Sequence, residues 1–330
     1  MSKSDFSVLV TGGAGYIGSH AVFALLDAHA KVTVIDNLST GVRANVSPDA
    51  RFVEGDIGDR DTLDTLLTDG NFTAIMHFAG SVVVPESVSD PLKYYGNNTA
   101  NTRLLIDRAV AHKVPHFIFS STAAVYGIPE GTVATEATPT LPINPYGASK
   151  LMSEWMLRDV AATGKLNYAA LRYFNVAGAD PEGRTGQSTP NATHLIKVAA
   201  EAALGKRREV SIFGTDFPTR DGTGVRDYIH VSDLVAAHVA ALNHLRAFPN
   251  DSHVLNLGYG HGYSVREVLD AVKRVNGSDF PVNEAARRPG DPPELVADSS
   301  RLRDTLDWQA RYDDLDLIVR SAIGWESKLS

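Results

Sequence analysis

The sequence predicts an α/β fold, a doubly wound parallel sheet joined to a smaller C-terminal substrate lobe. Short runs of apolar, β-branched residues alternate with segments of helical periodicity through the first half of the chain, as expected of βαβ units. The 330 residues, 43% of them hydrophobic, are enough to bury a large core. We expect residues 1–175 to form the sheet domain and 176–330 mainly the lobe, across a soft boundary that the chain can recross.

The expected strands share short length and apolar content, and they cover 7–11, 31–35, 52–53, 73–78, 116–120 and 168–173. Between them, apolar residues at helical spacing predict helices over 19–30, 61–67 and 101–111. The carboxyl ends of parallel strands meet at one edge of such a sheet, so ligands are expected there. Beyond residue 175 the alternation weakens, and loops rich in glycine and proline appear.

A glycine-rich turn separates the first strand from the first helix. Gly12, Gly15 and Gly18 allow a tight turn, close approach of the backbone to phosphate, and packing of helix on strand. The helix N-terminus then offers free N–H groups to a dinucleotide pyrophosphate. Asp36 ends the second strand, 18 residues beyond Gly18, where a carboxylate binds ribose hydroxyls and repels a 2′-phosphate. A merely tight turn is the alternative, but all three elements together favour a Rossmann-type site for NAD over NADP.

Tyr146 and Lys150 stand four residues apart in a helix expected to begin at Pro145, so both lie on one helical face. A free phenol has a pKa of about 10, and holding it as phenolate near neutral pH requires a shift of about three units, or about 4 kcal/mol. A lysine and a positive nicotinamide ring both favour the anion. Tyr-x-x-x-Lys alone also fits an ordinary surface helix. Beside the glycine turn it predicts a general base.

Composition excludes several classes of function. A net charge of −8 argues against nucleic acid or an anionic membrane as the main partner. The chain has no cysteine, which rules out disulfides, thiol nucleophiles and cysteine metal sites, and we assign no metal ligands. The first residues lack the apolar core of a signal peptide, and no apolar run reaches 18 residues. The chain is therefore expected to be cytoplasmic.

Beyond these motifs, the chain resembles the extended short-chain dehydrogenase/reductase family and, within it, the UDP-glucose 4-epimerases. The resemblance extends almost end to end. It rests on residues 10–20, 36–38, 54–57, 77–80, 85–87, 94–95, 97–98, 119–122, 125–127, 171–175 and 221–231. The segments in the second lobe are more specific to sugar-nucleotide enzymes than the glycine turn is.

The resemblance implies reversible C4 epimerisation of UDP-galactose and UDP-glucose through a 4-keto intermediate, with NAD bound throughout. Tyr146 would remove the C4 hydroxyl proton, directly or through Thr122, while the C4 hydride passes to NAD⁺. Lys150 would hold the nicotinamide ribose and tune Tyr146. The ketose would turn about its phosphate linkage and receive hydride and proton on its other face.

The motifs and the resemblance together imply two sets of binding residues. The cofactor set is Gly12, Gly15, Tyr16, Ile17, Gly18, Asp36, Asn37, Asp56, Ile57, Phe78, Ala79, Gly80, Asn97, Tyr146, Lys150 and Tyr173. The substrate set is Thr122, Tyr146, Asn175, His194, Leu195, Ser211, Phe213, Arg226, Arg288, Asp291 and Leu295. In this second set the two arginines would neutralise the phosphates, and Asp291 would contact the uridine ribose. The resemblance also implies a homodimer formed through a helix pair of the first lobe.

Two positions depart from well-known members of the family. Val82 stands where a lysine often lies near the cofactor. Leu295 occupies the position that sets the room around the sugar C2 substituent, and its size is intermediate between the bulky and the small residues found there. Acceptance of UDP-N-acetylhexosamines therefore stays open.

Other functions remain alternatives to this one. Ala123 and Ala124 follow Thr122 where a 4,6-dehydratase would carry an acid pair, which argues against dehydration. UDP-pentose and UDP-uronate epimerases are harder to separate, although a uronate would need an additional cation. A non-epimerising sugar-nucleotide reductase would consume its cofactor. A non-catalytic NAD sensor would commonly lose the tyrosine or the lysine, and this chain keeps both.

Overall fold

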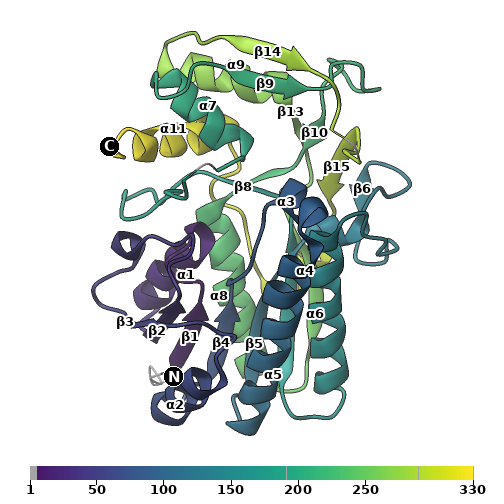
Figure 1. Ribbon diagram of the computed structural model, residues 1–330. Coiled ribbons are helices and arrows are strands. Elements are labelled where there is room, and N and C mark those ends of the chain that lie inside the picture. Colours follow the sequence, from purple (N-terminus) through teal and green to yellow (C-terminus); the bar gives the residue numbers. More distant parts are fainter. Residues whose placement is uncertain (1–5, 191, 289, 330) are drawn as a thin grey trace.

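The computed structural model describes residues 6–190, 192–288 and 290–329. A parallel seven-stranded sheet with the order β12-β7-β5-β4-β1-β2-β3 forms the larger part (Figure 1). In chain order its strands are β1 (Ser7–Thr11), β2 (Lys31–Asp36), β3 (Arg51–Glu54), β4 (Ala74–His77), β5 (His116–Thr122), β7 (Asn167–Tyr173) and β12 (His253–Leu257). The doubly wound sheet predicted from the sequence is confirmed.

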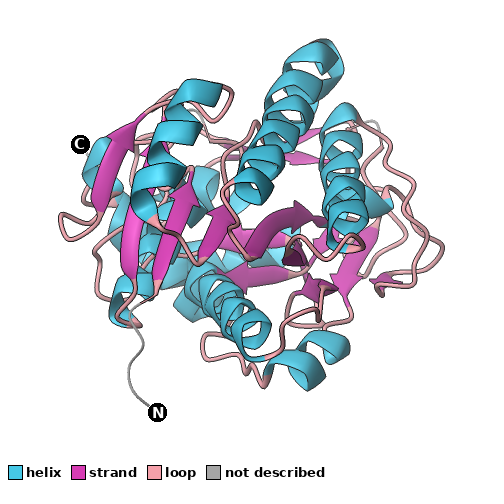
Figure 2. Cartoon of the chain, turned by 90° about the horizontal axis from the view of Figure 1, so that it is seen from below, coloured by secondary structure: helices cyan, strands magenta, loops and turns pink. Residues whose placement is uncertain are grey.

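Helices cover both faces of this sheet (Figure 2). Alternate residues of a strand point to opposite faces, so Val8 and Val10 pack in one buried cluster and Leu9 in another. The first cluster includes residues of α1 (Tyr16–Asp27) and α8 (Val231–Ala247). The second includes residues of α2 (Arg60–Gly70), α5 (Asn101–Ala111) and α6 (Pro145–Ala161). Burial on both faces explains why these strands read as continuous apolar runs.

Helix starts follow local capping chemistry. The Asn144 side chain accepts a hydrogen bond from the backbone N–H of Gly147 at 2.9 Å, and Pro145 occupies the first helical position of α6. The first helix begins at Tyr16, three residues earlier than predicted, because Gly15 is already its extended N-cap residue. It ends before the prediction as well, since His29 takes a left-handed conformation with φ of 62°.

Short elements connect these long ones. Between β4 and α5 lie α3 (Val84–Ser89), α4 (Pro91–Tyr94) and a π-helical turn, η2 (Tyr95–Ala100). Two 3₁₀ turns, η1 (Arg43–Asn45) and η3 (Ala123–Tyr126), follow β2 and β5. In the described ranges, no helix has both the length and the apolar content needed to cross a membrane.

A second group of elements lies beyond the carboxyl edge of the large sheet (Figure 1). It contains α7 (Leu195–Ala203), α9 (Val265–Asn276), α11 (Leu315–Glu326) and the pair β9 (Val210–Phe213) with β14 (Val282–Ala285), whereas α10 (Ser300–Leu306) packs on α8 and β12. A small sheet has the order β13 (Tyr263–Ser264), β10 (Val225–Arg226), β15 (Glu294–Ala297) and β6 (Val133–Ala134), and β8 (Asn175–Ala177) pairs with β11 (Tyr228–His230). The chain crosses between the groups repeatedly, because β6 precedes α6 while α8 and β12 return to the large sheet. The division at residue 175 stays a prediction.

A buried ion pair joins α6 to the large sheet. Arg172 on β7 binds Glu154 on α6 with 2.6 Å between Nη2 and Oε2, and both side chains are at most 7% exposed. The Ser121 hydroxyl also donates to Glu154, and Arg172 donates to the Tyr126 hydroxyl at 3.0 Å. With its remaining polar atoms satisfied in this way, the pair fixes how α6 sits on β5 and β7.

Glu154→Ala is expected to lower the free energy of unfolding by about 3–5 kcal/mol, because it leaves the Arg172 guanidinium buried without its carboxylate. Urea unfolding followed by circular dichroism measures the change. Asp159→Ala on the same helix is the control, since Asp159 is 66% exposed in its contact with Arg158, and such surface pairs contribute about 0–1 kcal/mol. Equal losses for the two variants would contradict this account.

Candidate active site

The glycine turn forms a backbone cradle at the N-terminus of α1. Gly12 has φ of 71°, and a side chain there would place Cβ 2.6 Å from the amide nitrogen of Ala79. A Cβ on Gly18 would collide with the carbonyl oxygen of Gly12. Gly15 is the N-cap residue, followed by Tyr16 and Ile17 in the first turn of α1. The helix N-terminus behind this turn and the absence of side chains on its glycines fit a pyrophosphate.

Acidic and polar side chains line the edge beside the cradle. Asp36, at the end of β2, accepts hydrogen bonds from the backbone N–H of Ala14 at 2.9 Å and of Leu38 at 2.8 Å. Asn37 donates to Asp56 at 2.8 Å, and the neighbouring Ile57 is buried. The Asp36 carboxylate is thus held close to the glycine turn, where it repels a further phosphate and can accept ribose hydroxyls.

The next strand along the sheet contributes its own edge residues. Phe78, Ala79 and Gly80 follow β4, with Ala79 against Gly12 and the Phe78 ring 5.2 Å from that of His238. Asn97 lies in the π-helical turn and donates to the Ser81 hydroxyl at 2.9 Å. Such turns occur frequently at functional sites.

Tyr146 and Lys150 are both buried in the first turns of α6, beside the ends of β5 and β7. The Lys150 ammonium donates to the carbonyl oxygen of Ser120 at 3.1 Å. Thr122 is the last residue of β5 and lies directly beside Tyr173 in the sheet register. The Ser120 and Tyr173 hydroxyls are 2.6 Å apart. The structure therefore brings the predicted tyrosine, lysine and threonine to one place, together with the predicted Tyr173.

Burial opposes the charged form of both groups in the pair. It raises the pKa of Tyr146 above the ordinary 10.0, while a hydrogen bond with Thr122 acts in the lowering direction. Burial also lowers the pKa of Lys150 from 10.5 to about 8. The phenol of the ligand-free chain is thus protonated near neutral pH, and a further positive charge close by is required to ionise it.

Tyr94 is a neighbour of this pair that the sequence analysis quoted without giving it a role. Its fully buried ring meets the Tyr146 ring edge to face, with 6.4 Å between centroids and 87° between planes. Its hydroxyl donates to the carbonyl oxygen of Val83 at 2.6 Å and lies 2.9 Å from Glu86. Val82, which the sequence analysis noted as a departure from the family pattern, is 53% exposed.

Asn98 is a second such residue. Its amide donates to the carbonyl oxygen of Ser81 at 2.9 Å and to the hydroxyl of Ser149 at 3.1 Å. Asn98 therefore links the segment after β4 to α6. Only one feature of the sequence pointed to Asn98, namely two consecutive asparagines, Asn97 and Asn98, in a segment without regular periodicity. The partners of Asn98 lie 17 and 51 residues away in the chain, so sequence spacing did not identify them.

The second lobe contributes a cluster of charged residues. Arg226 on β10 lies beside Leu295 on β15 in the small sheet, and its guanidinium is 3.4 Å from the Asp291 carboxylate. Arg288 lies over the Phe213 ring, 3.9 Å from the centroid, and its carbonyl oxygen accepts from the Asp291 backbone at 3.3 Å. The structure thus brings together Arg226, Arg288 and Asp291, the residues predicted to contact the phosphates and the uridine ribose.

Leu295 connects this cluster with the catalytic region. It is 8% exposed and packs in an apolar group with Ala123, Tyr126, Leu151 and the partly buried Phe174. Leu151 directly follows Lys150 in α6. Asn175 begins β8 immediately after this region, and its backbone N–H donates to the carbonyl oxygen of Asp227 at 3.0 Å.

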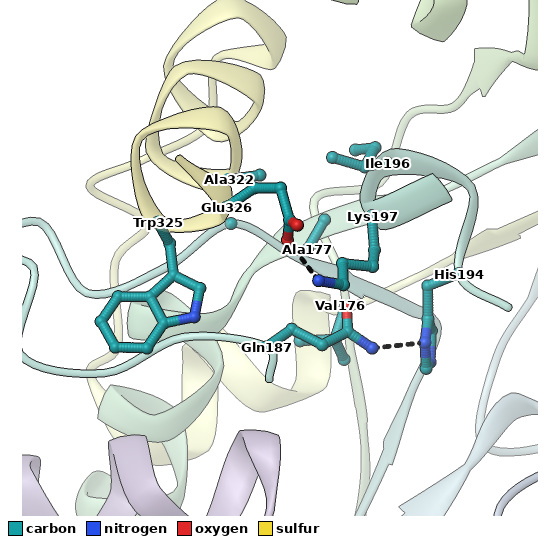
Figure 3. A pocket seen from close by; sticks show the side chains of 10 residues that line it. Val176, Ala177, Gln187, His194, Ile196, Lys197, Ala322, Trp325 and Glu326 are labelled. Carbon is teal, nitrogen blue, oxygen red and sulfur yellow. Dashed lines mark hydrogen bonds and ion pairs between the residues drawn. The ribbon is translucent and has the colours of Figure 1, made fainter. Parts of the chain in front are cut away.

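His194 and Leu195 lie at the start of α7, and Ser211 lies on β9. His194 lines a small pocket, where its Nδ1 atom is 2.7 Å from the Gln187 amide (Figure 3). Burial lowers the pKa of His194. The same pocket is lined by the ion-paired Lys197 and Glu326, which the sequence analysis did not single out. The structure thus places His194 in this pocket at the start of α7, and its predicted contact with the substrate stays a prediction.

Comparison with known proteins agrees with this geometry. Residues 8–258 match the model of the NAD dependent epimerase/dehydratase family. A UDP-glucose 4-epimerase of Azospirillum brasilense is 57% identical over 322 residues, which is 98% of this chain and 92% of that protein.

Two solved structures extend the match to the whole fold. The UDP-glucose 4-epimerase of Brucella ovis in complex with NAD gives a TM-score of 0.93 at 44% identity, covering 97% of this chain and 98% of that one. The UDP-Glc/GlcNAc 4-epimerase of Campylobacter jejuni gives 0.86 at 49% identity, covering 98% and 100%. The chain belongs to the NAD-dependent epimerase/dehydratase family.

Proposed function

We propose that the protein catalyses the NAD-dependent, reversible C4 epimerisation of UDP-galactose and UDP-glucose. The observation that carries the proposal is the buried Tyr146–Lys150 pair with Thr122, located at the sheet edge that also holds the glycine cradle. The arginine cluster of the second lobe meets the same region through Leu295. The relatives named above support the same activity.

NAD⁺, when bound, supplies the acceptor and then the donor of the C4 hydride. The cradle of Gly12, Gly15 and Gly18 would hold its pyrophosphate and Asp36 its adenosine ribose, while Tyr16 and Ile17 border the helix start. Asn37, Asp56 and Ile57 would surround the adenine end. Further along the sheet edge, Phe78, Ala79, Gly80, Asn97 and Tyr173 would contact the cofactor. Lys150 would bind the nicotinamide ribose.

Tyr146 would move the proton. Its phenol oxygen would accept the proton of the C4 hydroxyl, directly or through the Thr122 hydroxyl, and would return it after the sugar has turned. Burial raises the pKa of Tyr146 in the ligand-free chain, so the positive charges of Lys150 and of the bound cofactor are needed to lower it again. The base would then be active only when the site is assembled.

The second lobe would hold the UDP portion. Arg226 and Arg288 would neutralise the diphosphate, Asp291 would accept the uridine ribose hydroxyls, and the remaining contacts would come from Asn175, His194, Leu195, Ser211 and Phe213. Binding energy concentrated on the nucleotide leaves the sugar free to expose either face. This local positive charge offsets the net charge of −8 that would otherwise repel a diphosphate.

Leu295 raises a second candidate substrate, a UDP-N-acetylhexosamine. Its side chain is smaller than an aromatic ring, and it is already packed against Ala123 and Tyr126. The Campylobacter jejuni relative is named for both glucose and N-acetylglucosamine at 49% identity. A reductase remains a distinct alternative, because it would consume reduced cofactor.

We also propose a homodimer through α4 and α6. Leu92 on α4 is 79% exposed, and Trp155 and Met152 on α6 are 45% and 36% exposed. The two helices lie against each other on the same side of the sheet (Figure 1). Exposed apolar side chains gathered on neighbouring helices are typical of an interface between proteins.

With no cofactor added, the purified protein is expected to convert UDP-galactose into a mixture of UDP-galactose and UDP-glucose. Proton NMR of the products measures this conversion. Its bound NAD should stay constant in amount, because the two hydride transfers cancel. UDP-N-acetylgalactosamine, tested in parallel, is converted if Leu295 leaves room at C2. Failure to convert UDP-galactose even after NAD is supplied would overturn the proposal, and stoichiometric consumption of reduced cofactor would favour a reductase.

In the same assay Tyr146→Phe should lower kcat by at least about 100-fold, the usual size of a general acid–base contribution. Tyr168→Phe is the matched control, since it removes a phenol hydroxyl near the opposite end of β7. Its turnover is expected to stay near that of the unchanged protein. A fully active Tyr146→Phe would exclude Tyr146 as the base.

Lys150→Met should stabilise the cofactor-free chain near pH 7 while abolishing activity. Burial lowers the pKa of Lys150 from 10.5 to about 8, so between these values the unfolded chain binds more protons here and stability rises with pH. Below pH 8 the buried, charged Lys150 destabilises the folded chain, by at most about 3 kcal/mol at about 1.4 kcal/mol per pKa unit. The methionine variant has no such charge to bury. Its advantage in urea unfolding should therefore shrink from pH 8 towards pH 10.5.

The exposed Lys93→Met is the control for this series, because Lys93 is 46% exposed beside Glu86. It should show no comparable change in stability over the same pH range. A gain for Lys150→Met that does not vary with pH would contradict the explanation by charge burial.

Light scattering after size exclusion is expected to give twice the chain mass of 35.5 kDa. Trp155→Glu should shift the protein towards the monomer, because it places a charge in the proposed apolar interface. Val282→Glu, at a partly exposed residue of β14 in the second lobe, should leave the mass unchanged. A monomeric unchanged protein would refute the dimer.

A further inference from the structure

Two histidines and an aspartate meet where α8 connects to β12. His244 lies in the last turn of α8, and His253 is the first residue of β12. Asp251 lies in the turn between them. This is the amino edge of the large sheet, opposite the edge that carries Thr122 and Tyr173, each the last residue of its strand. The cluster is therefore outside the proposed active site.

Both histidines direct their Nε2 atoms to the Asp251 carboxylate. Asp251 Oδ2 is 2.8 Å from His244 Nε2, and Asp251 Oδ1 is 3.0 Å from His253 Nε2. The two Nε2 atoms are themselves 3.3 Å apart. Within the described part of the chain, the ligand atoms of this group lie within 4.8 Å of one another.

The separation of the two nitrogens matches a tetrahedral metal centre. Zinc–nitrogen bonds of about 2.0–2.1 Å at tetrahedral angles place two imidazole nitrogens about 3.3 Å apart. The nitrogen–oxygen separations are a few tenths of an ångström shorter than such a centre requires. The Asp251 side chain is 48% exposed, and it can therefore withdraw by that amount.

We propose that His244, Asp251 and His253 bind one divalent transition-metal ion of the zinc type, with water in the remaining position. Two imidazole nitrogens and one carboxylate oxygen suit zinc, cobalt or nickel, whereas magnesium and calcium prefer oxygen ligands. The exposed carboxylate side provides access for the ion. The ligands come from both sides of the turn, so a bound ion would link the end of α8 to the start of β12.

Other histidine–carboxylate contacts of the chain make the distinction clear. His112 is 2.8 Å from Asp64, and His261 is 2.8 Å from Asp313. Each of these contacts involves a single histidine, while His244 and His253 share one carboxylate and also face each other. The third ligand separates a candidate metal site from an ordinary hydrogen bond.

One neighbouring feature limits the affinity. His253 Nδ1 is buried and finds no hydrogen-bond partner in the described residues. Metal binding through Nε2 would place the ring proton on Nδ1, and a metal-bound histidine is usually supported by an acceptor at that position. We therefore expect an ion that a chelator removes readily, in contrast to a closed structural zinc site.

The consequence of binding would be stability of the turn rather than catalysis. The Phe248 ring packs on His244 with 4.9 Å between centroids, and Asn250 takes a left-handed conformation with φ of 80°. An ion bound only by the folded chain stabilises it increasingly as its free concentration rises. Because the site lies at the opposite edge of the sheet, epimerase turnover should stay the same.

The test uses untagged full-length protein that has been treated with EDTA and freed of chelator. Equilibrium dialysis against zinc chloride should give one ion per chain, and thermal unfolding should shift upward with zinc concentration. Replacement of zinc by cobalt should produce the visible absorption of a low-symmetry site with nitrogen and oxygen ligands. Asp251→Asn and His244→Ala should each weaken zinc binding at least tenfold, and His112→Ala should not.

Asp251→Asn keeps the test valid if His244→Ala fails to fold, because Asp251 is the exposed member of the group and its replacement disturbs the core less. Binding of fewer than one ion per chain would overturn the proposal. So would a zinc affinity and a thermal shift that survive unchanged in both ligand variants, which would assign the ion to another place. Neither result would bear on the epimerase assay.

Discussion

The buried contact between Arg172 and Glu154 is the constraint on which the geometry of the active site depends. A charged pair in an apolar interior is stable only if the partners meet in one arrangement, and here Ser121 and Tyr126 complete that arrangement. Tyr126 in turn donates to Asn256 on β12 at 2.6 Å. The rotation of α6, and with it the direction of Tyr146 and Lys150, is therefore coupled to three strands of the sheet.

Burial also explains why this site costs stability. The same apolar surroundings that hold α6 in place disfavour charge on Lys150 and on Tyr146. In the ligand-free chain burial keeps the Tyr146 phenol protonated, and the phenol ionises near neutral pH only when further positive charge enters. A site strained in this way before its ligands bind is a common compromise between folding and activity.

Local patterns allowed the sequence to predict much of this fold. The strand, glycine turn and helix around Gly12, and the four-residue spacing of Tyr146 and Lys150, depend on neighbours in the chain, and their periodicity is visible directly. The contact of Tyr94 with Tyr146 and the packing of Leu295 on Ala123 join residues far apart in the chain. No spacing rule reports such contacts. The same holds for the small sheet, where β6 pairs with β15.

The return of the chain to the large sheet has a consequence for its synthesis on the ribosome. β7 (Asn167–Tyr173) is an inner strand of the finished sheet, yet its outer neighbour β12 begins only at His253. α8, which packs on α1, is also made late. A nascent chain that has just released β7 thus exposes an apolar strand edge, which can pair with other chains. Until about eighty further residues have emerged, such a chain needs protection from aggregation.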